Sequence, residues 1–173
     1  MGSTNLDTSR LTLRAWAAEH LIALIERPAE FALVAGFPAA AGLRDFFTSG
    51  EVDAEWIAAL KTRHHAEPWS LGFAVCEKSS GLAVGTGGFK GAPDDAGVAE
   101  IAYGIVPDYE GKGYATEVAD ALTSYSIQSG VRTVRAHTLP EPNASNHILT
   151  KLGFTHVGDF VDPQDGLVWR WER

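Results

Sequence analysis

A glycine-containing turn between a strand and a helix limits the possible folds of this chain more than any other feature. Residues 107–117 read Pro-Asp-Tyr-Glu-Gly-Lys-Gly-Tyr-Ala-Thr-Glu. The apolar residues 101–106 predict a strand, and residues 114–128 have the spacing of an amphipathic helix. Gly111 and Gly113 can adopt positive φ angles, and the start of the helix presents unpaired N–H groups and a positive dipole end. The turn, with Lys112 at its centre, is therefore predicted to bind phosphate oxygens, as in a diphosphate.

Two common phosphate-binding motifs do not fit this turn. A P-loop requires a glycine, four residues and then Gly-Lys-Ser or Gly-Lys-Thr, and residues 104–107 supply no such frame. A dinucleotide fingerprint requires a third glycine where this chain has Thr116. The sequence therefore excludes the P-loop and gives the dinucleotide motif little support.

The turn, together with residues 98–103 and 143–154, resembles the GNAT superfamily of acyl-CoA-dependent N-acetyltransferases, and within it the RimJ/RimL-like branch. The resemblance extends from about Trp69 to Phe160, and its motifs follow the family's order. It implies an α/β fold of three layers, α/β/α, with a largely antiparallel, splayed central sheet. We expect residues 1–173 to form one domain of this kind.

Hydrophobic periodicity predicts the elements of this fold in detail. Strands are expected over residues 11–14, 71–77, 82–89, 97–106, 133–138, 155–161 and 166–171, and helices over 18–26, 51–63, 114–129 and 145–152. Residues 27–50 carry no clear pattern.

Composition narrows the location and the partners. The 173 residues are 45% hydrophobic and carry a formal net charge of −8, which disfavours binding to nucleic acid or to anionic membranes. A lone cysteine, Cys76, excludes an intramolecular disulfide, and its apolar neighbours predict a core residue. No signal peptide or membrane-spanning run is evident, so a cytoplasmic protein is expected. We expect no metal site, because the adjacent His64 and His65 diverge on a helix and are predicted to be surface residues.

Acetyl transfer to an amine first requires a base, because an ammonium group with a pKa of about 10 has no free electron pair. Glu100 lies in the predicted strand 97–106, on the same face as Ala102 and Gly104 and opposite to Tyr103. In the resembled family, a glutamate at this position often deprotonates the amine through a water molecule. An ion pair or an exposed strand residue is the alternative.

The reaction next requires donors for the tetrahedral oxyanion. The resemblance implies that backbone N–H groups near Ile105 supply them, at a bulge where the fourth strand diverges from the fifth. Gly104 suits such a bulge, and a glycine that eases the twist of the sheet is the alternative.

The departing thiolate also requires a donor. Many family members use a tyrosine in the helix that follows the fifth strand, but residues 145–154 contain none. Ser145 stands where the branch usually has a serine facing the coenzyme sulfur, so the resemblance makes it the candidate. An N-cap for the helix is the alternative role of Ser145, and Asn146 suits either role.

The resemblance further implies which residues contact acetyl-CoA: Ile105, Val106, Gly111, Lys112, Gly113, Tyr114, Ala115, Thr116 and Asn143. Asn143 falls one residue later than the asparagine common in the family. Glu110 stands where relatives usually carry arginine, glutamine or tryptophan. A carboxylate there is expected to weaken coenzyme binding unless it points to solvent or pairs with Lys112.

The sequence therefore predicts an N-acetyltransferase that moves the acetyl group of acetyl-CoA directly to a primary amine in a ternary complex. The branch includes enzymes acting on protein N-termini and on small-molecule amines, so both acceptors remain open, as does assembly into a homodimer. The alternative from another class of function is a non-catalytic module that binds acyl-CoA.

Overall fold

The computed structural model describes residues 4–49, 54–63 and 66–173. The strands are β1 (Asn5–Asp7), β2 (Leu11–Ala15), β3 (Phe73–Glu77), β4 (Ala83–Phe89), β5 (Val98–Ile105), β6 (Thr133–Thr138), β7 (Thr155–Asp162) and β8 (Gly166–Glu172). The helices are α1 (Ala18–Glu26), α2 (Phe31–Ala35), α3 (Asp45–Thr48), α4 (Ala54–Lys61), α5 (Pro68–Leu71), α6 (Tyr114–Gln128) and α7 (Ala144–Lys151), with 3-10 turns η1 (Pro28–Glu30) and η2 (Pro107–Tyr109).

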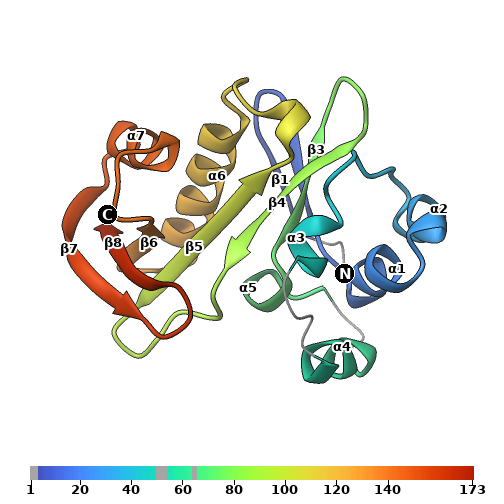
Figure 1. Cartoon of the computed structure of the whole chain (residues 1–173), viewed down its shortest axis with the longest axis horizontal. Coiled ribbons are helices and arrows are strands. Elements are labelled where there is room, and N and C mark those ends of the chain that lie inside the picture. Colours follow the sequence, from blue (N-terminus) through green and yellow to red (C-terminus); the bar gives the residue numbers. More distant parts are fainter. Residues whose placement is uncertain (1–3, 50–53, 64–65) are drawn as a thin grey trace.

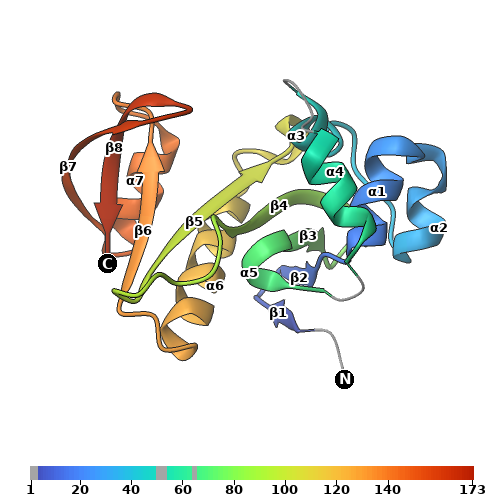
Figure 2. The ribbon, with the colours of Figure 1, turned by 90° about the horizontal axis from the view of Figure 1, so that it is seen from below.

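The strands form one sheet in the order β1-β2-β3-β4-β5-β6-β8-β7 (Figure 1). Neighbouring strands are antiparallel except β5 and β6, which pair in parallel at only three positions, Val98 to Glu100. Beyond Glu100 the two strands diverge, and Figure 2 shows the opening as a V. The predicted mixed, largely antiparallel and splayed sheet is confirmed.

Helices cover both faces of this sheet. A Cβ atom on Gly87 would lie 2.8 Å from Val118 of α6, whereas one on Gly88 would lie 2.7 Å from Gly72, directly after α5. Because successive residues of a strand face opposite sides, α6 and α5 lie on opposite faces of β4. The expected three layers are therefore present.

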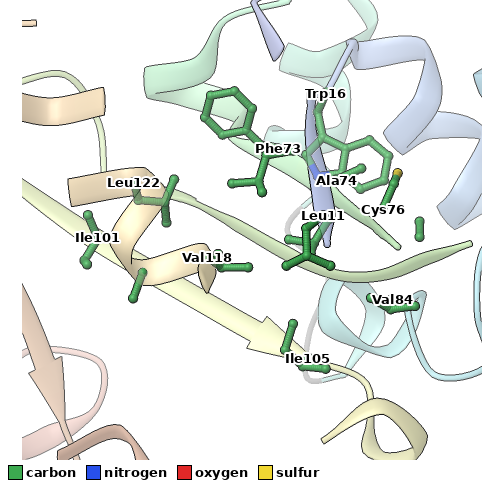
Figure 3. Close-up of a cluster of buried hydrophobic side chains, with 14 of the residues drawn as sticks. Leu11, Trp16, Phe73, Ala74, Cys76, Val84, Ile101, Ile105, Val118 and Leu122 are labelled. Carbon is green, nitrogen blue, oxygen red and sulfur yellow. The ribbon is translucent and has the colours of Figure 1, made fainter. Parts of the chain in front are cut away.

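The core forms where α6 meets the sheet and where β2 and β3 meet the N-terminal helices (Figure 3). Val118 and Leu122, one helical turn apart on α6, are fully buried and face the sheet. Ile101 of β5 belongs to the same core cluster. On the other face, Trp16 packs against Phe31 and Phe37, and its indole N–H donates to the Thr86 hydroxyl at 3.2 Å.

Most predicted elements form within about three residues of their expected bounds, the usual uncertainty of helix and strand ends. The expected helix 51–63 is observed as α4, and its first residues, 51–53, lie outside the described residues, as do His64 and His65. Cys76 is buried as predicted, and burial raises the pKa of its thiol to about 11, so it is not a nucleophile at neutral pH.

The prediction of a bulge at Gly104 is wrong. The register between β4 and β5 is regular from the pair Gly85–Ile105 to the pair Phe89–Ile101. A Cβ atom at position 104 would lie 2.6 Å from the ring of Phe46 in α3. Gly104 therefore lets an aromatic ring lie directly on the strand, a role that neither sequence alternative had considered.

Candidate active site

A cavity of about 630 Å³ lies beside the glycine turn, at the open end of the V. Its walls come from β5, from the turn with the first residues of α6, and from α7. We call it the coenzyme cavity. Of the residues expected to contact acetyl-CoA, the following line it: Ile105, Gly111, Gly113, Tyr114, Ala115 and Thr116.

The turn has the geometry that an anion site requires. Gly111 and Gly113 have φ angles of 76° and 83°, in the left-handed region that favours glycine. Gly113 is the N-cap of α6 and provides no side-chain cap, and the first bond of the helix runs from Glu117 N–H to the Gly113 carbonyl. The N–H groups of residues 114–116 are therefore left without helical partners at the edge of the cavity.

Three expected coenzyme residues lie elsewhere. Val106 is fully buried, and its N–H donates to the Val84 carbonyl at 2.8 Å. The Lys112 ammonium lies over the Tyr109 ring, 5.3 Å from its centroid, and among the described residues no ion pair joins it to Glu110. Asn143 lies just outside the cavity wall that α7 forms.

Asn143 is the N-cap of α7, because its side-chain oxygen accepts from Asn146 N–H at 3.1 Å. The N-cap alternative for Ser145 is therefore wrong: Ser145 follows Ala144 inside the first turn. The sequence misplaced the cap because serine and asparagine are both good caps and stand two residues apart. Asn146 is buried and donates to the Glu141 carbonyl, which fixes the loop before α7.

Among the described residues, no strand pairs with the β6-facing edge of β5 beyond Glu100, so we call this the free edge of β5. Val106 donates to β4, and the Glu100 carbonyl accepts from Lys90 N–H at 2.9 Å, also toward β4. Because successive backbone groups of a strand point to alternate sides, the N–H groups of Tyr103 and Ile105 point into the gap between β5 and β6. Both residues line the coenzyme cavity.

A second cavity, of about 350 Å³, lies in that gap, and we call it the gap cavity. Ser145 and Tyr103 line both cavities, so the two spaces meet at these side chains. Burial raises the pKa of the Tyr103 phenol, and a hydrogen bond with Ser145 opposes the rise only in part. The phenol therefore stays protonated at neutral pH and can donate a hydrogen bond.

Glu100 lines the gap cavity, and its side chain is about one-fifth exposed. One carboxylate oxygen is 2.7 Å from His137 Nδ1 and 3.2 Å from the Lys90 ammonium. Arg170 Nε donates to His137 Nε2 at 3.0 Å, which leaves the imidazole proton on Nδ1, facing Glu100. The ion pair that the sequence left as an alternative for Glu100 is therefore present, and the role of Glu100 as the base stays a prediction.

Tyr103, Lys90, His137 and Arg170 were missed as site residues. Each lies on a different part of the chain, and only the pairing of β4 with β5 and of β6 with β8 brings them together. The alternation of side chains along β5 does predict that Tyr103 and Glu100 point to opposite faces of the sheet. Sequence spacing cannot show that the Tyr103 phenol reaches α7. Their grouping follows from the tertiary fold.

Tyr114, the first residue of α6, connects the turn to the sheet. Its hydroxyl donates to a Glu77 carboxylate oxygen at 2.5 Å, and both residues are buried. This hydrogen bond lowers the pKa of Glu77 and raises the pKa of Tyr114. The Arg10 guanidinium lies 4.6 Å above the Tyr114 ring and pairs with Glu117, so the residue just before β2 and the last residue of β3 both hold the helix start in place.

Tyr114→Phe is expected to lower the free energy of unfolding by about 1–3 kcal/mol at pH 7, because it removes the main hydrogen bond to the buried Glu77 carboxylate. The folded-state pKa of Glu77 lies below its ordinary value of 4.5, so this contribution is complete above pH 4.5 and is lost as pH falls through the folded-state pKa. Urea denaturation at several pH values checks both points. Tyr109→Phe is the control, since no hydrogen bond of that hydroxyl is seen in the described part of the chain. A loss that stays constant down to acidic pH would contradict the carboxylate's role.

Within the ranges 4–49, 54–63 and 66–173, no three His, Cys, Asp or Glu side chains gather in a way that could hold a metal ion. In the same part of the chain, no helix combines the length and the apolar character needed to cross a membrane.

Comparison with known sequences places most of the chain in one family. The sequence pattern of the family described as "Acetyltransferase (GNAT) domain" matches residues 10–155. Two curated proteins are similar over shorter regions: the uncharacterized N-acetyltransferases YoaA of Bacillus subtilis (strain 168), 34% identical over 76 residues, and p20 of Bacillus licheniformis, 31% identical over 87 residues. These regions cover 43% and 50% of this chain, and 43% and 49% of the relatives. The matches thus span about half the length of the curated relatives or less.

Solved structures share the fold over nearly the whole chain. A GNAT-family acetyltransferase from Bacillus anthracis is 19% identical with a TM-score of 0.65, and covers 98% of both chains. RimL, a ribosomal L7/L12 α-N-protein acetyltransferase in complex with coenzyme A, is 16% identical with a TM-score of 0.66 and covers 98% of this chain and 97% of its own. The ribosomal-protein-S5-alanine acetyltransferase from Vibrio fischeri is 14% identical with a TM-score of 0.66, over 98% and 96%. At these identities the likeness establishes the fold.

Proposed function

Because the chain belongs to the GNAT acetyltransferase family, we propose that it transfers the acetyl group of acetyl-CoA directly to a primary amine. One observation carries the proposal. The glycine turn, the free edge of β5 and Ser145 surround one cavity, and this cavity meets the cavity that holds Glu100.

The chain offers a binding group for each part of the coenzyme. The N–H groups after Gly113 suit the diphosphate, and the free edge of β5 suits the amide-containing pantetheine arm, which can lie beside it like an added strand. The N–H groups of Tyr103 and Ile105 are about 6.6 Å apart along this edge. One of them meets the thioester carbonyl, and the other can bind an amide of the pantetheine arm. Glu110 also lines the coenzyme cavity, and its charge weakens this binding.

The reaction uses Glu100 as the base. Its carboxylate accepts a proton from the acceptor amine through a water molecule, which frees the nitrogen to attack the thioester carbon. One of the N–H groups of Tyr103 and Ile105 stabilises the negative charge that develops on the carbonyl oxygen. Ser145, which lines the cavity beside Tyr103, donates to the departing sulfur. Because the amine attacks the thioester directly, no enzyme-bound acetyl group is needed.

The acceptor in this proposal is a protein N-terminus or a small-molecule amine. RimL and the Vibrio fischeri protein act on ribosomal proteins, which supports the first. The net charge of −8 favours a cationic acceptor of either kind.

Release of free CoA thiol from acetyl-CoA, measured against a panel of peptides, amino acids, polyamines and aminoglycosides, tests the proposal. We expect amine-dependent thiol release with at least one class. CoA binding by calorimetry without thiol release from any amine would instead support the acyl-CoA-binding module.

Ser145→Ala is expected to lower kcat by about ten- to a hundredfold with little change in acetyl-CoA affinity, because it removes the donor to the leaving sulfur. Stability should change little, since Asn143 caps the helix. Asn143→Ala is the matched control, expected to cost about 1 kcal/mol of stability with a smaller effect on turnover. Steady-state kinetics and thermal unfolding of both variants check this, and unchanged turnover in Ser145→Ala would remove Ser145 from the mechanism.

A further inference from the structure

An amine of the chain itself already lies beside the proposed base. Lys90 directly follows β4 and is the cross-strand neighbour of Glu100, to whose carbonyl its backbone N–H donates at 2.9 Å. Its side-chain nitrogen is 3.2 Å from the Glu100 carboxylate, and the side chain is about half exposed. The Lys90 ammonium therefore occupies the place where an acceptor amine must lose its proton.

Lys90 also shares a space with the groups that would act on the thioester. Lys90, Glu100, Tyr103 and Ser145 all line the gap cavity, and the last two also line the coenzyme cavity. The four-carbon stem of lysine is flexible, so the amine can leave the carboxylate and move along this space toward Ser145.

The strength of the Lys90–Glu100 pair does not prevent this movement. Ion pairs in which one partner is about half exposed are weak, so the ammonium exchanges readily between paired and free positions. His137 holds the same Glu100 oxygen at 2.7 Å, so the carboxylate stays in place when the lysine leaves.

We propose that Lys90 is a self-acetylation site of this chain. The inference rests on the proposed function, since it uses the same base, the same donor and the same acyl thioester of CoA. Glu100 accepts one proton of the Lys90 ammonium and passes it to solvent. The freed nitrogen forms a bond with the thioester carbonyl carbon, and the carbon–sulfur bond breaks. A second proton of the nitrogen ends on the sulfur, with Ser145 as the donor, so the products are an amide at Lys90, CoA thiol and one released proton.

Two other lysines provide controls within the same molecule. Lys61 pairs with Glu26 at 3.0 Å and Lys78 pairs with Asp7 at 3.5 Å, and both are about as exposed as Lys90. Neither of them lines the coenzyme cavity or the gap cavity. Their acetylation therefore reports the rate of unassisted chemical reaction with acetyl-CoA at an ion-paired surface lysine.

The test incubates the full chain with acetyl-CoA and no added amine, and follows the occupancy of each lysine by peptide mass spectrometry. Lys90 is expected to react at least about a hundredfold faster than Lys61 and Lys78, the lower end of what a positioned base supplies. The rate at Lys90 is expected to be independent of protein concentration. Glu100→Gln is expected to bring Lys90 to the rate of the two control lysines, whereas Glu172→Gln, which alters an ion pair with Arg135 elsewhere, leaves it fast.

Equal rates at the three lysines would overturn the proposal, as would an unchanged rate at Lys90 in a folded Glu100→Gln variant. A rate that rises with protein concentration would also overturn it, because transfer would then occur between molecules. If Glu100→Gln fails to fold, the lysine comparison and the dilution series on the parent chain still decide. Thiol release with the amine panel is measured on the same preparation. If thiol is released with an added amine but Lys90 stays unmodified, only this inference is overturned. If neither thiol release nor acetylation of Lys90 occurs, the proposed function is overturned as well.

Discussion

Glu100→Gln is expected to lower kcat/KM about a hundredfold or more at neutral pH, because glutamine keeps the shape and hydrogen bonding of the side chain but lacks the basic electron pair. The deficit is expected to shrink at high pH, where more of an acceptor amine with a pKa of about 10 is already deprotonated. Steady-state kinetics from neutral to alkaline pH, with acceptor amine varied at saturating acetyl-CoA, measure both effects.

Glu172→Gln is the matched control for this variant. It also removes a carboxylate from an ion pair beside β6, here with Arg135, but it lies outside the gap cavity. Its kcat/KM is expected to stay close to that of the parent. Full activity of Glu100→Gln at pH 7 would mean that the amine loses its proton to bulk water or to another group, and that Glu100 serves only to pair with Lys90 and His137.

Gly113→Val is expected to cost several kcal/mol of CoA affinity, about a hundredfold or more in Kd. A branched side chain at a φ angle of 83° would crowd the diphosphate position and disturb the N–H groups at the start of α6. A Cβ at this position would also lie 3.2 Å from the Arg10 guanidinium, which pairs with Glu117. Isothermal titration calorimetry with CoA measures the affinity directly.

Backbone strain alone must be separated from loss of the diphosphate site. Gly130 has a φ angle of 89° and lies just beyond the other end of the same helix, and an added Cβ there would meet no other atom within 4 Å. Gly130→Val is therefore expected to lose similar stability while binding CoA like the parent. Parental CoA affinity in a folded Gly113→Val variant would show that the diphosphate binds elsewhere.

The sequence predicted the parts of this fold that local patterns encode. Glycines mark the turn at Gly111 and Gly113, and hydrophobic periodicity marks helix α6 and strand β6. All three form where expected. Residues 27–50 gave no prediction because α2 and α3 have five and four residues, too few to show a helical period. Their positions depend on packing of Phe31 of α2 and Phe47 of α3 against Trp16, contacts that are not local in the sequence.

The residues of the candidate site also fall into two groups, those that the sequence predicts and those that only the folded structure brings together. Glu100 and Ser145 could be proposed because they stand in recognisable runs of sequence, and the structure places both on the gap cavity. The hydrogen bonds of Glu100 with His137, and of His137 with Arg170, depend on three strands that meet only in the folded sheet. The close approach of Phe46 to Gly104 likewise depends on tertiary packing, which is why a bulge was expected in its place.

The short parallel pairing of β5 with β6 would link the proposed binding of acetyl-CoA to the stability of the fold. Only three residue pairs join the two halves of the sheet, so part of their hydrogen-bonding capacity is left for a ligand. A ligand that binds only the folded chain stabilises it by about 2.7 kcal/mol at a hundredfold excess over its Kd. The cellular supply of acetyl-CoA would thus set not only the rate of the reaction but also how rarely the two halves separate, and with it the lifetime of the chain against proteolysis.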